Sequence, residues 1–121
     1  STADGLTHNE VYPMLRGRNG DIWVGTSRGL SLIRNGSFAD NPLKEYKEVV
    51  QSFWEDRSGR LWIGAWGWLH RYENGRLKSL TPLLGREPLV WAIHEDRSGA
   101  VWVGAERGLF KFDGDRVTAH Y

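Results

Sequence analysis

Hydrophobic residues in this chain lie in short runs separated by polar turns rich in glycine, and this arrangement occurs three times. The most regular part reads glycine, any residue, aliphatic, tryptophan, aliphatic, glycine, and it is centred on Trp23, Trp62 and Trp102. These tryptophans are 39 and 40 residues apart. A period of about 40 residues with short apolar strands and glycine punctuation is typical of the blades of a β-propeller.

Each repeat resolves into four extended runs joined by turns. In the third repeat the runs cover residues 89–94, 101–105, 109–112 and 116–121, and they are rich in β-branched and aromatic residues. The turn at 96–99 begins with an aspartate, whose side chain can bond the backbone two residues on, and ends with a glycine. We find no helical periodicity, so the pattern predicts an all-β chain.

Two-residue turns of the Asn-Gly or Asp-Gly type join the last two strands of each repeat, at Asn35-Gly36, Asn74-Gly75 and Asp113-Gly114. The least regular part is residues 38–48, where Asn41-Pro42 should break a strand. We interpret it, and the stretch between Pro82 and Pro88, as loops between blades.

The sequence therefore predicts one partial propeller over residues 1–121, with three four-stranded antiparallel blades at about 9–40, 48–81 and 88–121. Propellers typically need about 4–8 blades to close, and three blades leave two apolar faces open. Two copies related by a two-fold axis would complete a six-bladed ring, so we expect the chain to be its own partner as a homodimer. Neighbouring blades of a longer parent protein are the alternative partner.

The tryptophans Trp23, Trp62 and Trp102 occupy the same apolar second strand in every copy. A four-stranded sheet of this length cannot bury both faces alone, and stacked repeats bury them against each other. We therefore expect these three side chains to be structural and to lie between adjacent blades.

The composition narrows the range of possible functions. With 16 basic and 15 acidic residues the net charge is +1, which gives no case for a nucleic-acid-binding face. No run approaches the roughly 18 apolar residues of a membrane helix, so we expect no membrane insertion. The chain has no cysteine, which excludes disulfides and thiolate metal sites.

Several segments resemble the repeat of the two-component regulator propeller family. In the first copy they are residues 4–11 (DGLTHNEV), 20–26 (GDIWVGT) and 28–30 (RGL), and residues 90–109 of the third copy follow the same pattern. The resemblance implies a ligand-sensing β-propeller that lies outside the membrane, ahead of a histidine kinase and response regulator in hybrid signalling proteins. It also implies a periplasmic or extracellular location, and carbohydrates are the ligands of many such proteins.

Two tryptophans break the repeat. Trp66 and Trp68 lie in the turn between the second and third strands of the middle copy, and Gly67-Trp68 stands where the other copies read Arg-Gly. A turn offers little core to bury such rings, and flat aromatic side chains stack on sugars or receive a partner's apolar surface. We interpret both as candidate ligand-binding residues, with packing against a neighbouring blade as the alternative.

Five further residues are weaker candidates for the same role. Trp54, Trp91 and His94 lie on first strands, which border the central channel of a propeller. Arg28 and Arg107 share one turn position and could hydrogen-bond an anionic or polyhydroxyl ligand, although solvated turn arginines would look the same.

Catalytic signals are weak. The segment from Gly25 to Gly29 matches G-x-S-x-G, but that motif needs a following helix and here a strand is predicted. The four histidines are scattered without metal-site spacing, and the acidic pair Glu55-Asp56 begins a turn with its two side chains on opposite faces. We expect no metal, no cofactor and no catalytic residue.

The interpretation that accounts for most of these features is a non-catalytic propeller module that binds a ligand, with a glycan as the candidate. Two alternatives remain open. One is a self-assembling propeller fragment with no ligand of its own. The other is a propeller lyase or hydrolase, which would need His, Glu and Arg side chains converging near the axis.

Overall fold

The computed structural model of the chain describes residues 13–17, 19–26, 29–39, 43 and 46–121. Over these residues the protein is all-β, with twelve strands in three four-stranded antiparallel sheets, which confirms the three predicted blades. The strands of each sheet pair in chain order, so each blade is a simple meander. A short 3-10 helix, η2 (Thr81–Leu84), lies in the connection between blades 2 and 3.

The strand bounds follow the predicted runs closely. Blade 1 contains β1 (Met14–Arg16), β2 (Ile22–Thr26), β3 (Gly29–Arg34) and β4 (Ser37–Phe38). Blade 2 contains β5 (Val50–Glu55), β6 (Leu61–Ala65), β7 (Trp68–Glu73) and β8 (Arg76–Ser79). Blade 3 contains β9 (Val90–Glu95), β10 (Val101–Ala105), β11 (Gly108–Asp113) and β12 (Arg116–His120).

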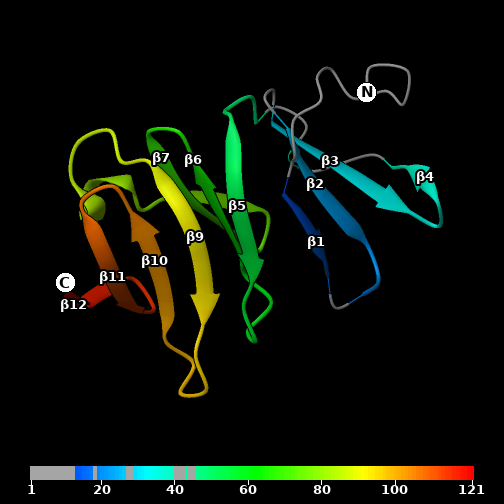
Figure 1. The fold of residues 1–121 in the computed structure, drawn as a ribbon. Coiled ribbons are helices and arrows are strands. Elements are labelled where there is room, and N and C mark those ends of the chain that lie inside the picture. The colour runs from blue at the N-terminus through cyan, green and yellow to red at the C-terminus, as the bar shows by residue number, and fades with distance from the viewer. Residues whose placement is uncertain (1–12, 18, 27–28, 40–42, 44–45) are drawn as a thin grey trace.

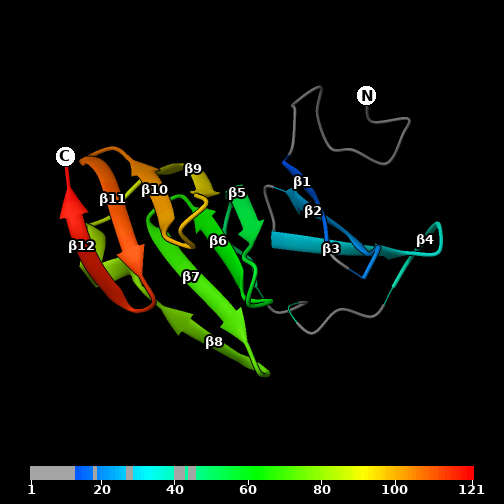
Figure 2. The same ribbon diagram turned by 90° about the horizontal axis from the view of Figure 1, so that it is seen from below.

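The blades stand side by side with their first strands, β1, β5 and β9, toward one another (Figure 1). Seen from below, the outer strands β4, β8 and β12 point away from this shared edge like the ribs of a fan (Figure 2). This is the arrangement expected of successive propeller blades, whose inner strands surround a common axis.

Two of the three hairpin turns are as predicted. Both residues of Asn35-Gly36 and of Asn74-Gly75 have positive φ, at 53° and 80° and at 51° and 75°, as a tight two-residue turn requires. The third turn is Gly114-Asp115, one residue later than predicted. Asp113 pairs with Arg116 in the ladder, so it belongs to the strand, and Gly114 supplies the positive φ of 59°.

In blades 1 and 2, the repeated tryptophan packs against the next blade. Trp62 on β6 is fully buried and meets Phe112 of blade 3 edge-on, with ring centroids 5.3 Å apart. Trp23 packs in the same way against the cluster of blade 2 that contains Ile63. Trp102 holds the same register position on β10, and it lies on the face of blade 3 that no described strand covers.

The buried indole of Trp62 is tied to the turn that precedes its strand. Trp62 Nε1 donates to Asp56 Oδ2 at 2.8 Å, and Arg60 Nε donates to the same oxygen at 2.8 Å. The other oxygen, Asp56 Oδ1, accepts the backbone N–H groups of Ser58 and Arg60, each at 3.0 Å. The bond to Ser58 confirms the predicted turn, in which an aspartate bonds the backbone two residues on.

Blade 3 repeats this arrangement. Trp102 Nε1 donates to Asp96 Oδ2 at 2.8 Å, and Asp96 Oδ1 accepts the backbone N–H groups of Ser98 at 2.9 Å and Ala100 at 3.1 Å. The bonds from Ser98 and Trp102 hold the pKa of Asp96 well below its ordinary value. Burial by itself would raise the pKa of Asp56, but the bonds from Trp62 and Arg60 outweigh it and leave that pKa lowered.

Blade 1 keeps the turn but has no such carboxylate, because Gly17 stands in the position of Asp56 and Asp96. Its backbone follows the same path: Gly17 N–H donates to Asp21 O at 2.8 Å, as Asp56 N–H donates to Arg60 O at 2.9 Å. Trp23 therefore follows a turn that has the same backbone path but no aspartate at position 17 to accept its indole N–H.

We expect Asp56→Asn to lower the free energy of unfolding by about 2 kcal/mol at pH 7, because buried donors lose a charged acceptor. The pKa of Asp56 is lowered in the folded protein, so its contribution is complete above the ordinary value of 3.8 and is lost as the pH falls through the folded value. Urea unfolding of parent and variant at pH 7 and at about pH 2 measures this. An equal difference at both pH values would contradict it.

We expect Gly17→Asp to raise the free energy of unfolding by about 1 kcal/mol, because the new carboxylate can accept the Trp23 N–H. A Cβ at Gly17 would have Asn19 Oδ1 at 3.3 Å and both Asp21 O and Glu55 Oε2 at 3.6 Å as neighbours, so the Asn19 side chain must shift slightly to admit it. Thermal and urea unfolding measure the gain. Gly17→Ala is the control, since it adds the Cβ without the acceptor; an equal gain from alanine would refute the explanation.

Candidate functional site

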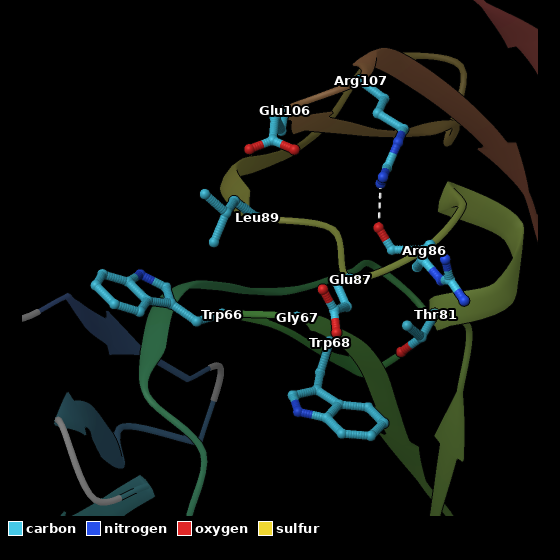
Figure 3. Close-up of a pocket in the computed structure, with 9 residues that line it drawn as sticks. All are labelled: Trp66, Gly67, Trp68, Thr81, Arg86, Glu87, Leu89, Glu106 and Arg107. Carbon is cyan, nitrogen blue, oxygen red and sulfur yellow. Dashed lines mark hydrogen bonds between the residues drawn. The ribbon is translucent and has the colours of Figure 1, made fainter.

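A hollow of about 640 Å³ opens at the edge where blades 2 and 3 meet (Figure 3). Three segments form it: the β6–β7 turn, the connection between the blades, and the β10–β11 turn. Its size is within the range of small-molecule sites in proteins. The lining residues are Trp66, Gly67, Trp68, Thr81, Arg86, Glu87, Leu89, Glu106 and Arg107.

Backbone hydrogen bonds hold the three segments together. The β6–β7 turn bonds the connection through Gly67 N–H to Pro88 O at 2.7 Å, and the β10–β11 turn bonds it through Glu106 N–H to Leu89 O at 2.9 Å. Trp66 also forms an isolated β-bridge with Leu89. The walls of the hollow are thus anchored to both blades by the main chain.

The local path of the chain explains why tryptophan is tolerated at position 68. The matching glycines of the other blades have no room for a side chain: a Cβ at Gly108 would lie 2.2 Å from Tyr121 O, and one at Gly29 would lie 1.8 Å from Tyr46 O. In blade 2 the Leu69 N–H donates to Thr81 Oγ1 at 3.0 Å, where in blade 3 the Leu109 N–H donates to Tyr121 O at 3.1 Å. A threonine hydroxyl therefore takes the place of the blade 3 carbonyl that excludes a side chain.

Trp66 lies in the β6–β7 turn as predicted, whereas Trp68 is the first residue of β7 and pairs with Ala65. Both are exposed, at 55% for Trp66 and 41% for Trp68, but their rings extend in different directions (Figure 3). Trp68 stacks on His70, with ring centroids 5.7 Å apart and planes 22° apart. His70 Nδ1 lies 2.9 Å from Tyr46 Oη. Burial lowers the pKa of His70, which keeps the ring neutral at pH 7, and so the stack under Trp68 carries no charge.

Trp68 also borders a second, smaller hollow of about 210 Å³ on the side of blade 2 that faces blade 1. Tyr46, Glu48 and His70 are among the residues that line it. The Trp68 side chain therefore lines both hollows, and Trp66 lines the larger one.

The charged residues of the larger hollow balance. Arg86 and Arg107 contribute two positive charges to its lining, and Glu87 and Glu106 contribute two negative charges. The Arg107 guanidinium reaches across the hollow to donate to the backbone oxygen of Arg86 (Figure 3). His120 Nε2 in turn lies 2.9 Å from the Arg107 carbonyl oxygen. A lining with two charges of each sign suits an uncharged polar ligand better than a strongly charged one.

Three of the seven ligand-binding candidates, Trp66, Trp68 and Arg107, come together in this hollow, although only the first two were expected to share a turn. Trp54 and His94 lie elsewhere, with ring centroids 5.2 Å apart, and Trp54 packs on the core between blades 2 and 3.

Of the two remaining candidates, only Trp91 lies among the described residues. Trp91 is 56% exposed on β9, beside a β-bulge, and lies outside the hollow. Arg28 is outside the described residues.

Residues of the connection were not predicted to contribute. Arg86 and Glu87 lie in the stretch between Pro82 and Pro88 that the sequence marks only as a loop, while Thr81 closes the range predicted for blade 2 and Leu89 begins the predicted strand 89–94. Glu87 has a φ of 46°, which is uncommon for a residue with a side chain and tends to occur at ligand sites. Turn-forming residues identify a loop in the sequence, but they do not show which residues the loop will contact in the folded protein.

Among the residues that the structure describes, no group of three or more His, Asp or Glu side chains is placed to hold a metal ion. In the same part of the chain, no helix is both long and apolar enough to cross a membrane. The segment that matches G-x-S-x-G continues into the strand β3, where a nucleophile elbow would need a helix.

Comparison with known proteins confirms the resemblance seen in the sequence. A family model described as two component regulator propeller matches residues 5–28. The structure is similar to the extracellular domain described as that of a hybrid two component system from B. thetaiotaomicron, with a TM-score of 0.80 and 23% identity over 96% of this chain and 16% of that chain. No curated protein matches the sequence.

Two further solved structures extend the comparison. The extracellular domain described as that of a one component system from B. thetaiotaomicron matches with a TM-score of 0.72 and 26% identity, over 96% of this chain and 17% of that chain. Virginiamycin B lyase from Staphylococcus aureus matches with a TM-score of 0.68 and 19% identity, over 88% of this chain and 39% of that chain. The chain thus spans 16% and 17% of the two sensor domains.

The different space at position 68 and at its counterpart Gly108 can be tested by adding a side chain at Gly108 and removing the one at Trp68. We expect Gly108→Ala to lower the free energy of unfolding by about 2–3 kcal/mol, because the new Cβ would overlap Tyr121 O at a φ of 124°. Trp68→Gly should cost about 1 kcal/mol or less, since its ring is partly exposed and no carbonyl presses on it. Urea unfolding measures both.

The control for Gly108→Ala is Gly99→Ala, where φ is 92° and nothing lies within 4 Å of the new Cβ. It separates the cost of the backbone conformation from that of the overlap. Equal losses at the two glycines would show that the overlap with Tyr121 O contributes nothing.

Proposed function

We propose that this chain is part of an extracytoplasmic sensor propeller and that it binds a neutral polyhydroxyl ligand, a glycan, in the hollow between blades 2 and 3. The observation that carries the proposal is the pair of exposed indoles, Trp66 and Trp68, on a turn where the other repeats have none. Two exposed indoles so close together offer flat apolar faces of the kind that can receive a ligand.

The polar lining supports a carbohydrate over an apolar ligand. Thr81, Glu87 and Glu106 offer hydroxyl and carboxylate oxygens, and Arg86 and Arg107 offer donors, around the two indoles. Sugars present hydroxyl groups at their edges and C–H groups on their faces, and this combination of charged polar groups and flat rings matches both. The extracellular placement rests on the sensor domains to which the fold is similar.

We further propose that the module is not catalytic. The hollow contains no histidine and no serine. Its two carboxylates, Glu87 and Glu106, come from a loop and a turn rather than from the inner strands where a propeller enzyme would gather His, Glu and Arg. The lyase among the structural neighbours shares only 19% identity and supports the fold alone.

We expect Trp66→Ala and Trp68→Ala each to weaken glycan binding about tenfold or more, which corresponds to roughly 1.4 kcal/mol for a lost stacking ring. Isothermal titration calorimetry, after a thermal-shift screen of neutral and anionic oligosaccharides, measures this. Neutral oligosaccharides should give the larger shifts, because the charges of the lining balance.

The matched control is Trp91→Ala, which removes an indole of similar exposure that lies outside the hollow. It should leave binding unchanged. If no oligosaccharide shifts the melting temperature of the parent chain, the glycan proposal fails and a propeller segment without a ligand becomes the better explanation. Equal losses from Trp91→Ala and Trp66→Ala would move the site away from the hollow.

A further inference from the structure

Two hollows flank blade 2, and corresponding segments of the repeat form them. The larger hollow is lined in part by the connection that leads into β9, through Arg86 and Glu87. The smaller hollow is lined by the connection that leads into β5, through Tyr46, Lys47 and Glu48. Each connection therefore contributes the residues just before a first strand to one hollow.

The strand pairing puts both hollows at the same end of the blades. Val50 pairs with Ala65 and Val90 pairs with Ala105, so β5 and β9 both begin where the second strand of their blade ends. Trp68 pairs with Ala65 at that end, and its side chain lines both hollows. The hollows are therefore neighbours along one edge, and they adjoin at Trp68.

The Trp68 ring is supported from the side of the smaller hollow. It stacks on His70, and His70 Nδ1 lies 2.9 Å from the Tyr46 hydroxyl. Both supporting residues line the smaller hollow. The ring extends away from Arg107, which lies across the larger hollow (Figure 3). Since Trp68 is 41% exposed, a ring that is already held in position faces solvent where the two hollows meet.

The smaller hollow has the chemistry of the larger one on a reduced scale. Lys47 and Glu48 contribute one charge of each sign, and Tyr46 and His70 contribute uncharged rings. Its volume of about 210 Å³ is below the range of about 300–1,000 Å³ that independent small-molecule sites occupy, whereas the larger hollow, at about 640 Å³, is within it. A small hollow beside a larger one of like chemistry suits a further unit of the same ligand.

We propose that the ligand is a linear oligosaccharide whose chain crosses Trp68 and places sugar units in both hollows. The inference rests on the proposed glycan function, and it adds the length of the ligand and a second set of contacts. The larger hollow provides most of the affinity, and the smaller hollow distinguishes chains from single sugars. A chain bound in this way joins the connection before blade 2 to the β10–β11 turn of blade 3.

Isothermal titration calorimetry with neutral sugars of increasing length tests the proposal. The probes are cello-, xylo- and manno-oligosaccharides, each series running from the monosaccharide to the hexasaccharide. In the series that binds, the affinity should rise about tenfold or more once the chain is long enough to reach the smaller hollow, and it should then level off.

Variants of the smaller hollow separate its contribution from that of the larger one. Leu77→Ala and Glu48→Gln should each weaken binding of the long chain about fivefold or more and leave binding of the shortest bound sugar unchanged. Trp66→Ala, in the larger hollow, should weaken both. Leu83→Ala is the matched control, because Leu83 is 42% exposed against 41% for Leu77 and lines neither hollow. It should change neither affinity.

Equal affinity for the monosaccharide and for every longer chain would overturn the inference. Variants of the smaller hollow that weaken short and long sugars alike, or weaken neither, would overturn it as well. In each of these cases the proposed function stands, because the parent chain still binds a sugar. If no sugar of any length binds, the proposed function itself fails. Circular dichroism checks the fold, and Lys47→Ala, at an exposed loop position, replaces a variant that does not fold.

Discussion

The contact between blades 2 and 3 depends on one interaction: a large indole is buried between two sheets with its N–H group bonded. Burying a tryptophan removes a large apolar surface from water, but an unbonded N–H in the same place would cost a good part of the gain. Asp56 satisfies the Trp62 N–H from the turn before its strand and is itself held by two backbone N–H groups of that turn. Turn, strand and contact between blades are therefore one unit at Trp62, and the bond from turn to indole repeats at Asp96 and Trp102 on the uncovered face of blade 3.

This unit also determines where variation is tolerated. The apolar strands must stay alike, because each blade has to fit the next. The β6–β7 turn and the connection from Thr81 to Leu89 lie at the other end of the blades, where they bond each other and the β10–β11 turn, although Leu84 of the connection is buried in the core between blades 2 and 3. Trp66 and Trp68 are exposed there and lie outside that core, which is why they can be presented at this edge.

The hollow between blades 2 and 3 and the uncovered face of blade 3 are separate surfaces with different chemistry. The hollow has balanced charges around two exposed rings, whereas the uncovered face carries Trp102 with the Lys111 Nζ 5.4 Å from its ring centroid.

The sequence by itself determined the parts of this protein that depend on neighbouring residues. Strand periodicity, the Asn-Gly turns and the repeated tryptophan were enough to predict three four-stranded blades. Two turns were misplaced by one residue: the hairpin at Gly114-Asp115, and the β6–β7 turn, because Trp68 already belongs to β7. The prominence of Trp66 and Trp68 was also visible, because a turn has little core in which to bury such rings.

Only the tertiary structure decided which residues share a surface. It brought Arg86 and Glu87 to the hollow beside Trp66, placed Trp54 and His94 away from it, and showed that Arg71 reaches Asp115 across two blades. These contacts join residues that are up to 44 positions apart. They depend on the path of the connections and on the angle between blades, and local patterns of hydrophobicity and turn residues carry no information about either.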